Sequence, residues 1–161
     1  MSSQFVNQKQ KRAYNLHITY ISDMSFKVVL DEKRKSLMKE AINVQEKAYS
    51  PYSKFKVGAA ILTKSGKIFT GCNIENVSYS MTICAERVAV FKAISEGHTD
   101  FEAIAISASS NESIYPCGAC RQVLAEFNPK IEVFVNHDEK SYPLYDLLPK
   151  SFDQEQLNSK L

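Results

Sequence analysis

The stretch YPCGACRQVL, residues 115–124, holds two of the chain's four cysteines three positions apart, directly after a proline. Apolar residues continue at helical spacing to Phe127, and the Asn-Pro pair that follows ends the pattern, so a helix is predicted over residues 117–127. Residues three apart in a helix lie on one face. The thiols of Cys117 and Cys120 are therefore expected to converge in the first turn of this helix.

A third cysteine, Cys84, opens another helical pattern that runs from about Ile83 to Gly97. At a helix start, unpaired backbone N–H groups and the helix dipole stabilise a thiolate, which is the form of cysteine that binds metal. Three thiolates from two helix starts predict a zinc site. The fourth cysteine, Cys72, ends a predicted strand and is expected to be a small buried residue without a metal role.

Glu86 follows Cys84 by two residues. A carboxylate at this position can simply complement the helix dipole. It is also within reach of a water bound to zinc, and three protein ligands, an open position and a nearby carboxylate are typical of a hydrolytic zinc centre. The sequence therefore favours chemistry at this site over a purely structural clamp.

Outward from the cysteines, predicted helices and strands alternate along the chain, which favours a sheet covered on both faces. A hairpin near the start makes that sheet mixed. The prediction is a three-layer α/β/α sandwich with about five strands, and one catalytic domain over residues 32–161 after an N-terminal extension, residues 1–31. The predicted helices are Asp31 to about Ser50, Ile83–Gly97 and Cys117–Phe127, and the predicted strands are Phe55–Thr63, Lys67–Cys72, Ala103–Ala108, Ile131–Val135 and a short segment Ser141–Leu144.

Composition limits the partners. The chain has 161 residues, 24% of them charged, and a formal net charge of only +2. No large field of one sign is therefore available for nucleic acid or an anionic membrane, and tryptophan is absent. The N-terminal stretch lacks the apolar run of a secretory signal. These features predict a cytoplasmic protein that acts on a small molecule.

Cys84-Ala85-Glu86 followed by Pro116-Cys117-Gly118-Ala119-Cys120 resembles the signature of the zinc nucleoside deaminases. Other motifs extend the match over about residues 33–157. With them the chain is similar to cytidine deaminases of the small homotetrameric, three-cysteine type. These motifs are Ser50-Pro51-Tyr52-Ser53, Phe55, Val57-Gly58-Ala59-Ala60, Gly71-Cys72-Asn73-Ile74-Glu75-Asn76, Arg121-Gln122-Val123 and Leu147-Leu148-Pro149.

The resemblance implies one zinc ion per subunit, held by Cys84, Cys117 and Cys120. It also implies that Glu86 takes a proton from water, passes it to ring N3 of cytidine and later protonates the departing amine. The products are uridine and ammonia, and deoxycytidine is an expected second substrate. Such a reaction serves pyrimidine salvage.

The same resemblance implies a set of substrate-binding residues. Asn73 and Glu75 would bind the ribose hydroxyls, although both could instead order a polar loop. Phe55 would stack on the base, although a phenylalanine at a strand start can also be plain core. The backbone of Ala85 would hold the base edge. A neighbouring subunit of a homotetramer would contribute Tyr79 and Phe152, which could equally be packing residues within one chain.

Two arginines are candidates for tuning the metal. Three thiolates leave zinc with net negative charge, which opposes ionisation of its water, so hydrogen-bond donors to sulfur are expected nearby. Arg87 and Arg121 stand beside Glu86 and Cys120 in the sequence. Surface salt bridges are the alternative for both.

Two other functions remain open on the sequence. The substrate could be another aminopyrimidine nucleoside, of the blasticidin type. The chain could also be a non-enzymatic zinc domain, with Cys72 closing a four-thiolate site.

Overall fold

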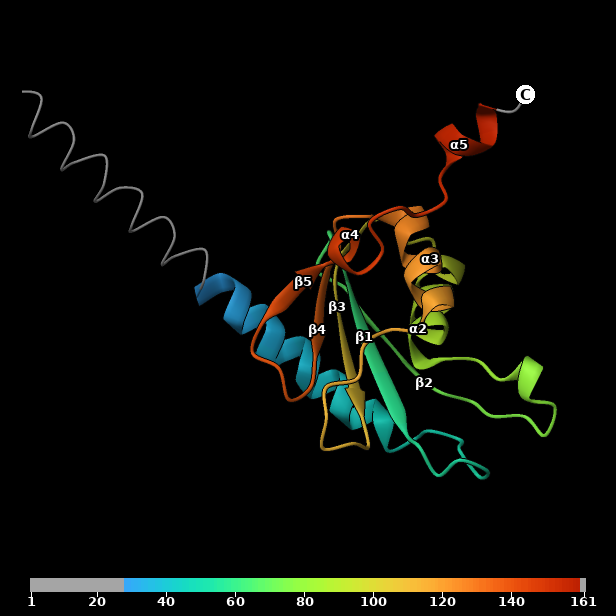
Figure 1. The fold of residues 1–161 in the computed structure, drawn as a ribbon. Helices are drawn as coiled ribbons and strands as arrows, with labels where there is room; N and C mark the ends of the chain where they lie inside the picture. Colours follow the sequence, from blue (N-terminus) through green and yellow to red (C-terminus); the bar gives the residue numbers. More distant parts are fainter. Residues whose placement is uncertain (1–27, 160–161) are drawn as a thin grey trace, which may run out of the picture. The chain divides into compact units, whose positions relative to one another are not determined.

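The computed structural model describes residues 28–159 and divides the chain into two compact units, residues 1–35 and 36–161. A helix covers residues 28–45, and only residues 28–35 of this helix belong to the smaller unit. Most of the predicted extension, residues 1–31, lies outside the described residues, and its boundary stays a prediction. The larger unit contains the whole sheet and the cysteines, and its ribbon is drawn in Figure 1.

Five strands form one mixed sheet in the order β2-β1-β3-β4-β5. Neighbouring strands are antiparallel except β3 and β4, which are parallel. The predicted mixed sheet is therefore confirmed. The strands are β1 (Val57–Thr63), β2 (Ile68–Cys72), β3 (Phe101–Ala108), β4 (Glu132–Val135) and β5 (Ser141–Pro143).

Two glycines identify the layers on either side of the sheet. A Cβ on Gly58 would lie 2.1 Å from the carbonyl oxygen of Ala41, in the helix of residues 28–45. A Cβ on Gly71 would lie 2.4 Å from the backbone nitrogen of Ala89, in α2 (Ala85–Ser95). Gly71 pairs with Ala59, the neighbour of Gly58, so the two glycines face opposite sides. Helices therefore cover both faces of the sheet, as predicted.

The central strand β3 shows why the sheet needs both layers. Seven of its eight residues, FEAIAISA, are buried, and such a continuous apolar run is typical of a strand covered on both faces. The core extends from β3 into α2, where Ala89, Val90 and Ala93 are fully buried. The helix α3 (Gly118–Phe127) adds Leu124 to the same core.

The first predicted helix was too long at its C-terminal end. It ends at residue 45 instead of near residue 50, because the backbone of Tyr49 pairs with the segment after β2. Tyr49 donates to the carbonyl of Asn73 at 3.0 Å and accepts from the amide of Glu75 at 2.8 Å. These strand-like bonds compete with a continued helix.

Three short elements were not predicted from the sequence: a 3-10 turn, η1 (Tyr79–Met81), and two helices, α4 (Leu144–Leu147) and α5 (Gln154–Asn158). Each is too short to produce a clear hydrophobic period. In the part of the chain that the structure describes, no helix has the length and apolarity needed to cross a membrane.

Candidate zinc and substrate site

The topology of the sheet brings two helix starts together. β2 and β3 both run antiparallel to β1 and hence parallel to each other. The segments that leave their carboxyl ends therefore emerge at the same edge of the sheet, and α2 and α3 begin there (Figure 1). Crevices at the carboxyl ends of parallel strands are common ligand sites in α/β proteins.

Three cysteines converge at this edge. Cys84 is the N-cap of α2, Cys117 is the N-cap of α3, and Cys120 lies in the first turn of α3. The sulfurs of Cys84 and Cys117 are 3.9 Å apart, and those of Cys117 and Cys120 are 3.5 Å apart. All three lie within 4.8 Å of one another and form the single metal-competent group found among residues 28–159. The predicted convergence of the thiols is thus observed.

The spacing of the sulfurs suits zinc. Tetrahedral coordination with Zn–S bonds of about 2.3 Å requires sulfurs about 3.8 Å apart, which lies between the two measured distances. Hydrogen bonds to the sulfur of Cys84, first from Cys120 and then from Arg87 and Cys117, lower the pKa of its thiol to about 5. Cys84 therefore presents a thiolate, the form that zinc binds. The hydrogen bond of Cys120 with Cys84 and the burial of Cys120 raise the pKa of the Cys120 thiol, so Cys120 releases its proton when a metal binds.

Glu86 is buried beside the cysteines, with 5% of its surface exposed. Burial raises the pKa of its carboxyl group, and the negative charge of Cys84 adds to that effect. A carboxyl group in this setting holds a proton more readily than a solvated one and can both accept and return it. The alternative of a solvated carboxylate that only complements the dipole of α2 does not fit this burial.

A cavity of about 210 Å³ opens onto Cys84, Cys117 and Glu86. It contains four residues predicted for the substrate or the proton, namely Phe55, Asn73, Ala85 and Glu86, together with Cys84 and Cys117. The remaining lining is mostly apolar, as is usual for pockets that bind small ligands. It consists of Val57, Thr82, Ile83, Ile106, Ile114 and Tyr115.

The side chains of Asn73 and Glu75 are both buried, and both form hydrogen bonds with backbone groups. The side chain of Asn73 accepts from the amide of Val57 and donates to the carbonyl of Phe55, each at 2.8 Å. Glu75 accepts from the amide of Tyr52 at 2.9 Å and from the amide and hydroxyl of Ser53. Ordering of a polar loop is therefore part of the role of both residues. Of the two, only Asn73 lines the cavity.

Tyr79 and Phe152 lie away from this cavity. Tyr79 is 68% exposed in η1 and meets the ring of Tyr52 edge-on at 5.9 Å. Phe152 is 55% exposed, and its backbone exchanges two hydrogen bonds with the side-chain amide of Gln122. Neither side chain is buried in the core of its own chain.

The two arginines behave differently. Arg87 donates to the sulfur of Cys84 at 3.6 Å, as predicted. Arg121 was expected to do the same, but it donates to the carbonyl oxygens of Pro116 and Leu147, each at 2.7 Å. Its side chain leaves α3 about 100° around the axis from that of Cys120, which explains why the prediction of a bond to sulfur is wrong. Arg121 instead links Pro116, in the segment before α3, to Leu147, the last residue of α4.

Cys72 is separate from the cysteine group. Its sulfur donates to the carbonyl of Lys47 at 3.4 Å, and burial raises the pKa of its thiol. This contact contradicts the alternative of a closed four-thiolate site.

Sequence reasoning did not identify most of the cavity wall. Ile106, Ile114 and Tyr115 come from the end of β3 and the segment after it, and their place in the wall depends on how that segment returns to α3. Only Tyr115 carried a usable signal, because it directly precedes the Pro-Cys pair of the cysteine motif.

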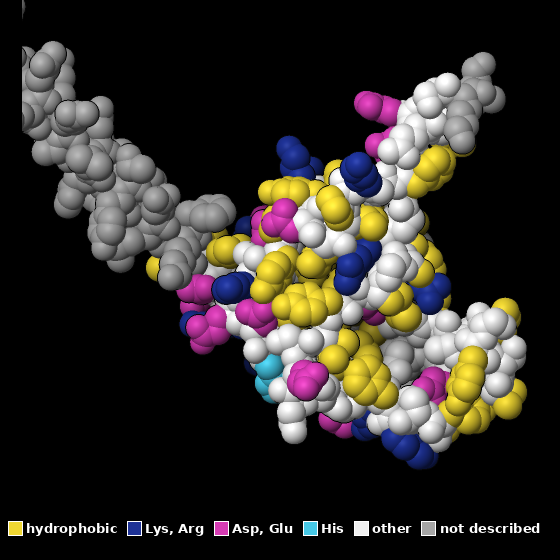
Figure 2. Space-filling model, viewed as in Figure 1, with side chains coloured by type: hydrophobic (Ala, Val, Ile, Leu, Met, Phe, Trp, Pro, Cys, Tyr) yellow, Lys and Arg dark blue, Asp and Glu magenta, His cyan; other side chains and the backbone are white. Residues whose placement is uncertain are grey.

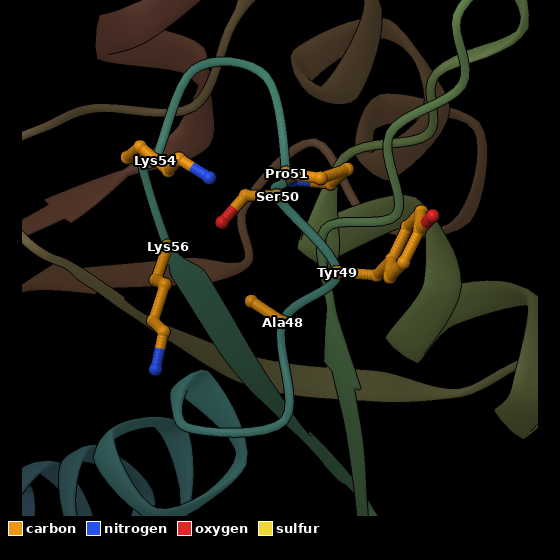
Figure 3. Close-up of a pocket in the computed structure, with 6 residues that line it drawn as sticks. All are labelled: Ala48, Tyr49, Ser50, Pro51, Lys54 and Lys56. Atoms are coloured by element: carbon orange, nitrogen blue, oxygen red, sulfur yellow. The ribbon is translucent and has the colours of Figure 1, made fainter.

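A second cavity, of about 370 Å³, lies over the loop that follows the first helix (Figure 3). It is lined by Ala48, Tyr49, Ser50, Pro51, Lys54 and Lys56. In Figure 3 Lys54 points toward Ser50 of the same loop, and Lys56 forms an ion pair with Glu46 at 2.8 Å. This cavity holds no cysteine, so the chemistry belongs to the smaller one.

Residues 31–136 match the family described as the cytidine and deoxycytidylate deaminase zinc-binding region. The chain belongs to this family. A cytidine deaminase of Halalkalibacterium halodurans is 49% identical over 129 residues, which cover 78% of this chain and 98% of that relative. A cytidine deaminase of Sporosarcina psychrophila is 48% identical over 126 residues, 76% of this chain and 93% of the relative.

The crystal structure of a cytidine deaminase from Burkholderia pseudomallei superimposes with a TM-score of 0.70 at 46% identity. The superposition covers 73% of this chain and 98% of that one. These comparisons and the cysteine group show that the chain has the cytidine deaminase-like fold and is a zinc-dependent hydrolytic deaminase.

Proposed function

We propose that this deaminase converts cytidine, and also deoxycytidine, to uridine or deoxyuridine and ammonia. The observation that carries the proposal is one cavity whose lining includes Cys84, Cys117 and Glu86 together with Phe55 and Asn73. A flat aromatic base and a polar sugar fit such a lining. Pyrimidine salvage is the matching role, and a cytoplasmic location stays a prediction from the sequence.

Zinc held by Cys84, Cys117 and Cys120 would supply the positive charge that makes a water molecule acidic near neutral pH. Glu86 would take one proton from the attacking water and give it to ring N3, while the water oxygen adds to C4 of the base. Glu86 would next take the remaining proton from the oxygen that has added to C4 and give it to the amino group. The C4–N bond breaks, and ammonia leaves. Water and cytidine thus balance uridine and ammonia.

Burial supports Glu86 in this task. A carboxyl group removed from water holds its proton more readily than a solvated one, and it can then release that proton to a basic nitrogen. Arg87 donates to the sulfur of Cys84 and thereby draws negative charge away from the metal ligands. Phe55 can stack on the base, and the backbone of Ala85 can bind the polar edge of the base.

The test is ammonia release from cytidine by the purified protein and by Glu86→Gln, with zinc measured in both. Glu86→Gln removes the proton carrier and preserves the volume, so we expect a zinc-loaded protein with at least about a 1,000-fold lower turnover. Glu126→Gln, the same change at an exposed site on α3, is the matched control and should keep full activity. A zinc-loaded wild-type protein without turnover of cytidine and deoxycytidine would refute the proposal, and turnover of a blasticidin-type nucleoside alone would favour that alternative substrate.

We further propose a homotetramer in which Tyr79 and Phe152 complete the site of a neighbouring subunit. Their exposure and their absence from the cavity lining of their own chain support this arrangement. The segment from β2 to α2 carries further exposed apolar residues, Ile74, Val77 and Met81. Figure 2 shows hydrophobic side chains on the segment that projects at its lower right. Such a patch is typical of a protein interface.

Subunit mixing tests this arrangement. Glu86→Gln and Phe152→Ala subunits should each form an inactive enzyme. After reassembly of a mixture, a site with intact Glu86 can receive an intact Phe152 from its neighbour, and part of the activity should return. A fully active monomer in sedimentation, or a mixture as inactive as its components, contradicts the tetramer proposal.

A further inference from the structure

Tyr115 links the substrate cavity to the turn between β4 and β5. It lines the cavity two residues before Cys117, and its hydroxyl donates to the carboxylate of Asp138 at 2.9 Å. Neither Asp138 nor any residue of β5 belongs to the cavity lining. Tyr115 therefore contributes to the wall of the cavity, while its hydroxyl is bound to a carboxylate outside the lining.

Asp138 holds this hydroxyl within a small network. Tyr142, in β5, donates to the same carboxylate oxygen at 2.7 Å, and its ring meets that of Tyr115 edge-on at 5.4 Å. The other carboxylate oxygen accepts from the amide of Lys140 at 2.9 Å. These donors lower the pKa of Asp138, so the half-buried carboxylate is ionised at neutral pH and accepts strong hydrogen bonds.

The turn lies at the correct edge of the sheet for this role. β3 and β4 are parallel, so the turn after β4 and the segment after β3 emerge on the same side. His137, with φ of +60°, reverses the chain directly before Asp138. The carboxylate thereby reaches the segment that leads into the cysteine motif, which fixes the ring of Tyr115 from outside the cavity.

We propose that Tyr115 determines which substituents on the base the site accepts, and that Asp138 is the positioning residue that holds the ring of Tyr115 in place. The inference rests on the proposed function. In that reaction C4 lies at the metal and N3 at Glu86, so C5 is on the opposite side of C4. The segment with Tyr115 flanks the cysteines from the end of β3, whereas Glu86 comes from α2. Tyr115 therefore limits the space beside C5.

Steady-state kinetics on cytidine and 5-bromocytidine, with zinc content and thermal unfolding measured on each protein, tests the proposal. Loss of a wall group in an apolar pocket changes discrimination roughly 10- to 200-fold per methylene-sized volume. Tyr115→Ala should therefore raise the ratio of kcat/KM for 5-bromocytidine to that for cytidine by at least about 10-fold. Zinc content should not change.

Two milder variants isolate the tether. Tyr115→Phe keeps the ring and removes the hydroxyl, and Asp138→Asn removes the charge. Each should raise KM for cytidine by roughly 3- to 10-fold and leave kcat within about twofold, because loss of one charge-assisted hydrogen bond loosens the wall without touching the proton path. Tyr145→Phe, the same deletion at an exposed position of α4, should leave both constants unchanged.

The outcomes are distinguishable. Absence of wild-type turnover on both nucleosides overturns the proposed function and this inference with it. Wild-type turnover with an unchanged substrate ratio in zinc-loaded, folded Tyr115→Ala overturns the inference alone. Equal losses in kcat for both substrates in Tyr115→Phe and Asp138→Asn reduce the network to a structural role and also overturn it.

Discussion

Replacement of Gly71 by alanine should displace the helix that carries part of the zinc site. The added Cβ would lie 2.4 Å from the nitrogen of Ala89 and 2.6 Å from the carbonyl oxygen of Ala85. Both are backbone atoms of α2, so no side chain can rotate away. Ordinary contact distances then require α2 to retreat by about 1 Å, at a cost of roughly 1–3 kcal/mol in the free energy of unfolding.

This displacement reaches the chemistry because Cys84 caps α2 while Cys117 and Cys120 belong to α3. A metal site tolerates distance errors of about 0.2 Å, so a shift of one ligand by about 1 Å weakens zinc binding. Glu86 moves with the same helix. Misplacement of this size costs on the order of 100-fold in turnover, and we expect at least that loss in kcat/KM for Gly71→Ala.

Gly58→Ala is the matched control. Its Cβ would lie 2.1 Å from the carbonyl oxygen of Ala41 and 2.6 Å from the nitrogen of Gln45, in the helix on the other face of the sheet. It should destabilise the fold at least as much, yet leave the zinc content and the turnover of the folded fraction within about fivefold of wild type.

The assay combines thermal unfolding, zinc content per folded chain, and kcat/KM for cytidine at a temperature where all three proteins are folded. Equal zinc and equal turnover in Gly71→Ala and wild type would refute the argument that α2 is positioned by this contact. Equal losses of turnover in both variants would show that general destabilisation, and not the position of α2, controls the site.

Three further predictions concern single side chains. Arg87→Ala should lower turnover by about 10-fold with most of the zinc retained, because the sulfur of Cys84 loses a donor; unchanged turnover contradicts this. Cys72→Ser should leave zinc and turnover unchanged, since its thiol donates to the carbonyl of Lys47 and does not belong to the cysteine group, and zinc loss would restore the four-thiolate alternative. The pKa of Glu75 is lowered, first by the hydroxyl of Ser53. Its stabilising contribution is therefore complete above its ordinary pKa of 4.5 and is lost as the pH falls through the lower folded value. Glu75→Gln should flatten the decline of Tm as the pH falls below 4.5, and an unchanged pH profile would exclude this residue as the cause.

Local sequence patterns were sufficient to predict the strands that build the sheet and the metal ligands. Strand β3 is apolar along nearly its whole length because both of its faces are covered. Cys117 and Cys120 were paired correctly because the period of a helix alone brings positions three apart onto one face. Such inferences need only the neighbouring residues.

Local patterns failed where a distant segment competes for the same groups. The helix of residues 28–45 was predicted to continue, and the bonds of Tyr49 to the segment after β2 end it. Arg121 stands next to Cys120 in the sequence, yet its donors reach the carbonyl oxygens of Pro116 and Leu147. Adjacency along a helix does not give adjacency in space, because each residue turns by about 100°.

The amino-acid sequence alone was enough for the layered α/β architecture, the three thiols and the carboxylate beside them, because helical and strand periods and the ends of elements are local properties. The three-dimensional fold was needed to show which side chains enclose the cavity and which of them are already engaged. The carboxylate of Glu75 is bound to the loop of Ser53, whereas Tyr115 is held in the wall by a carboxylate 23 positions further along the chain. Those arrangements depend on parallel strands bringing separate segments to one edge of the sheet, and no short stretch of sequence contains that information.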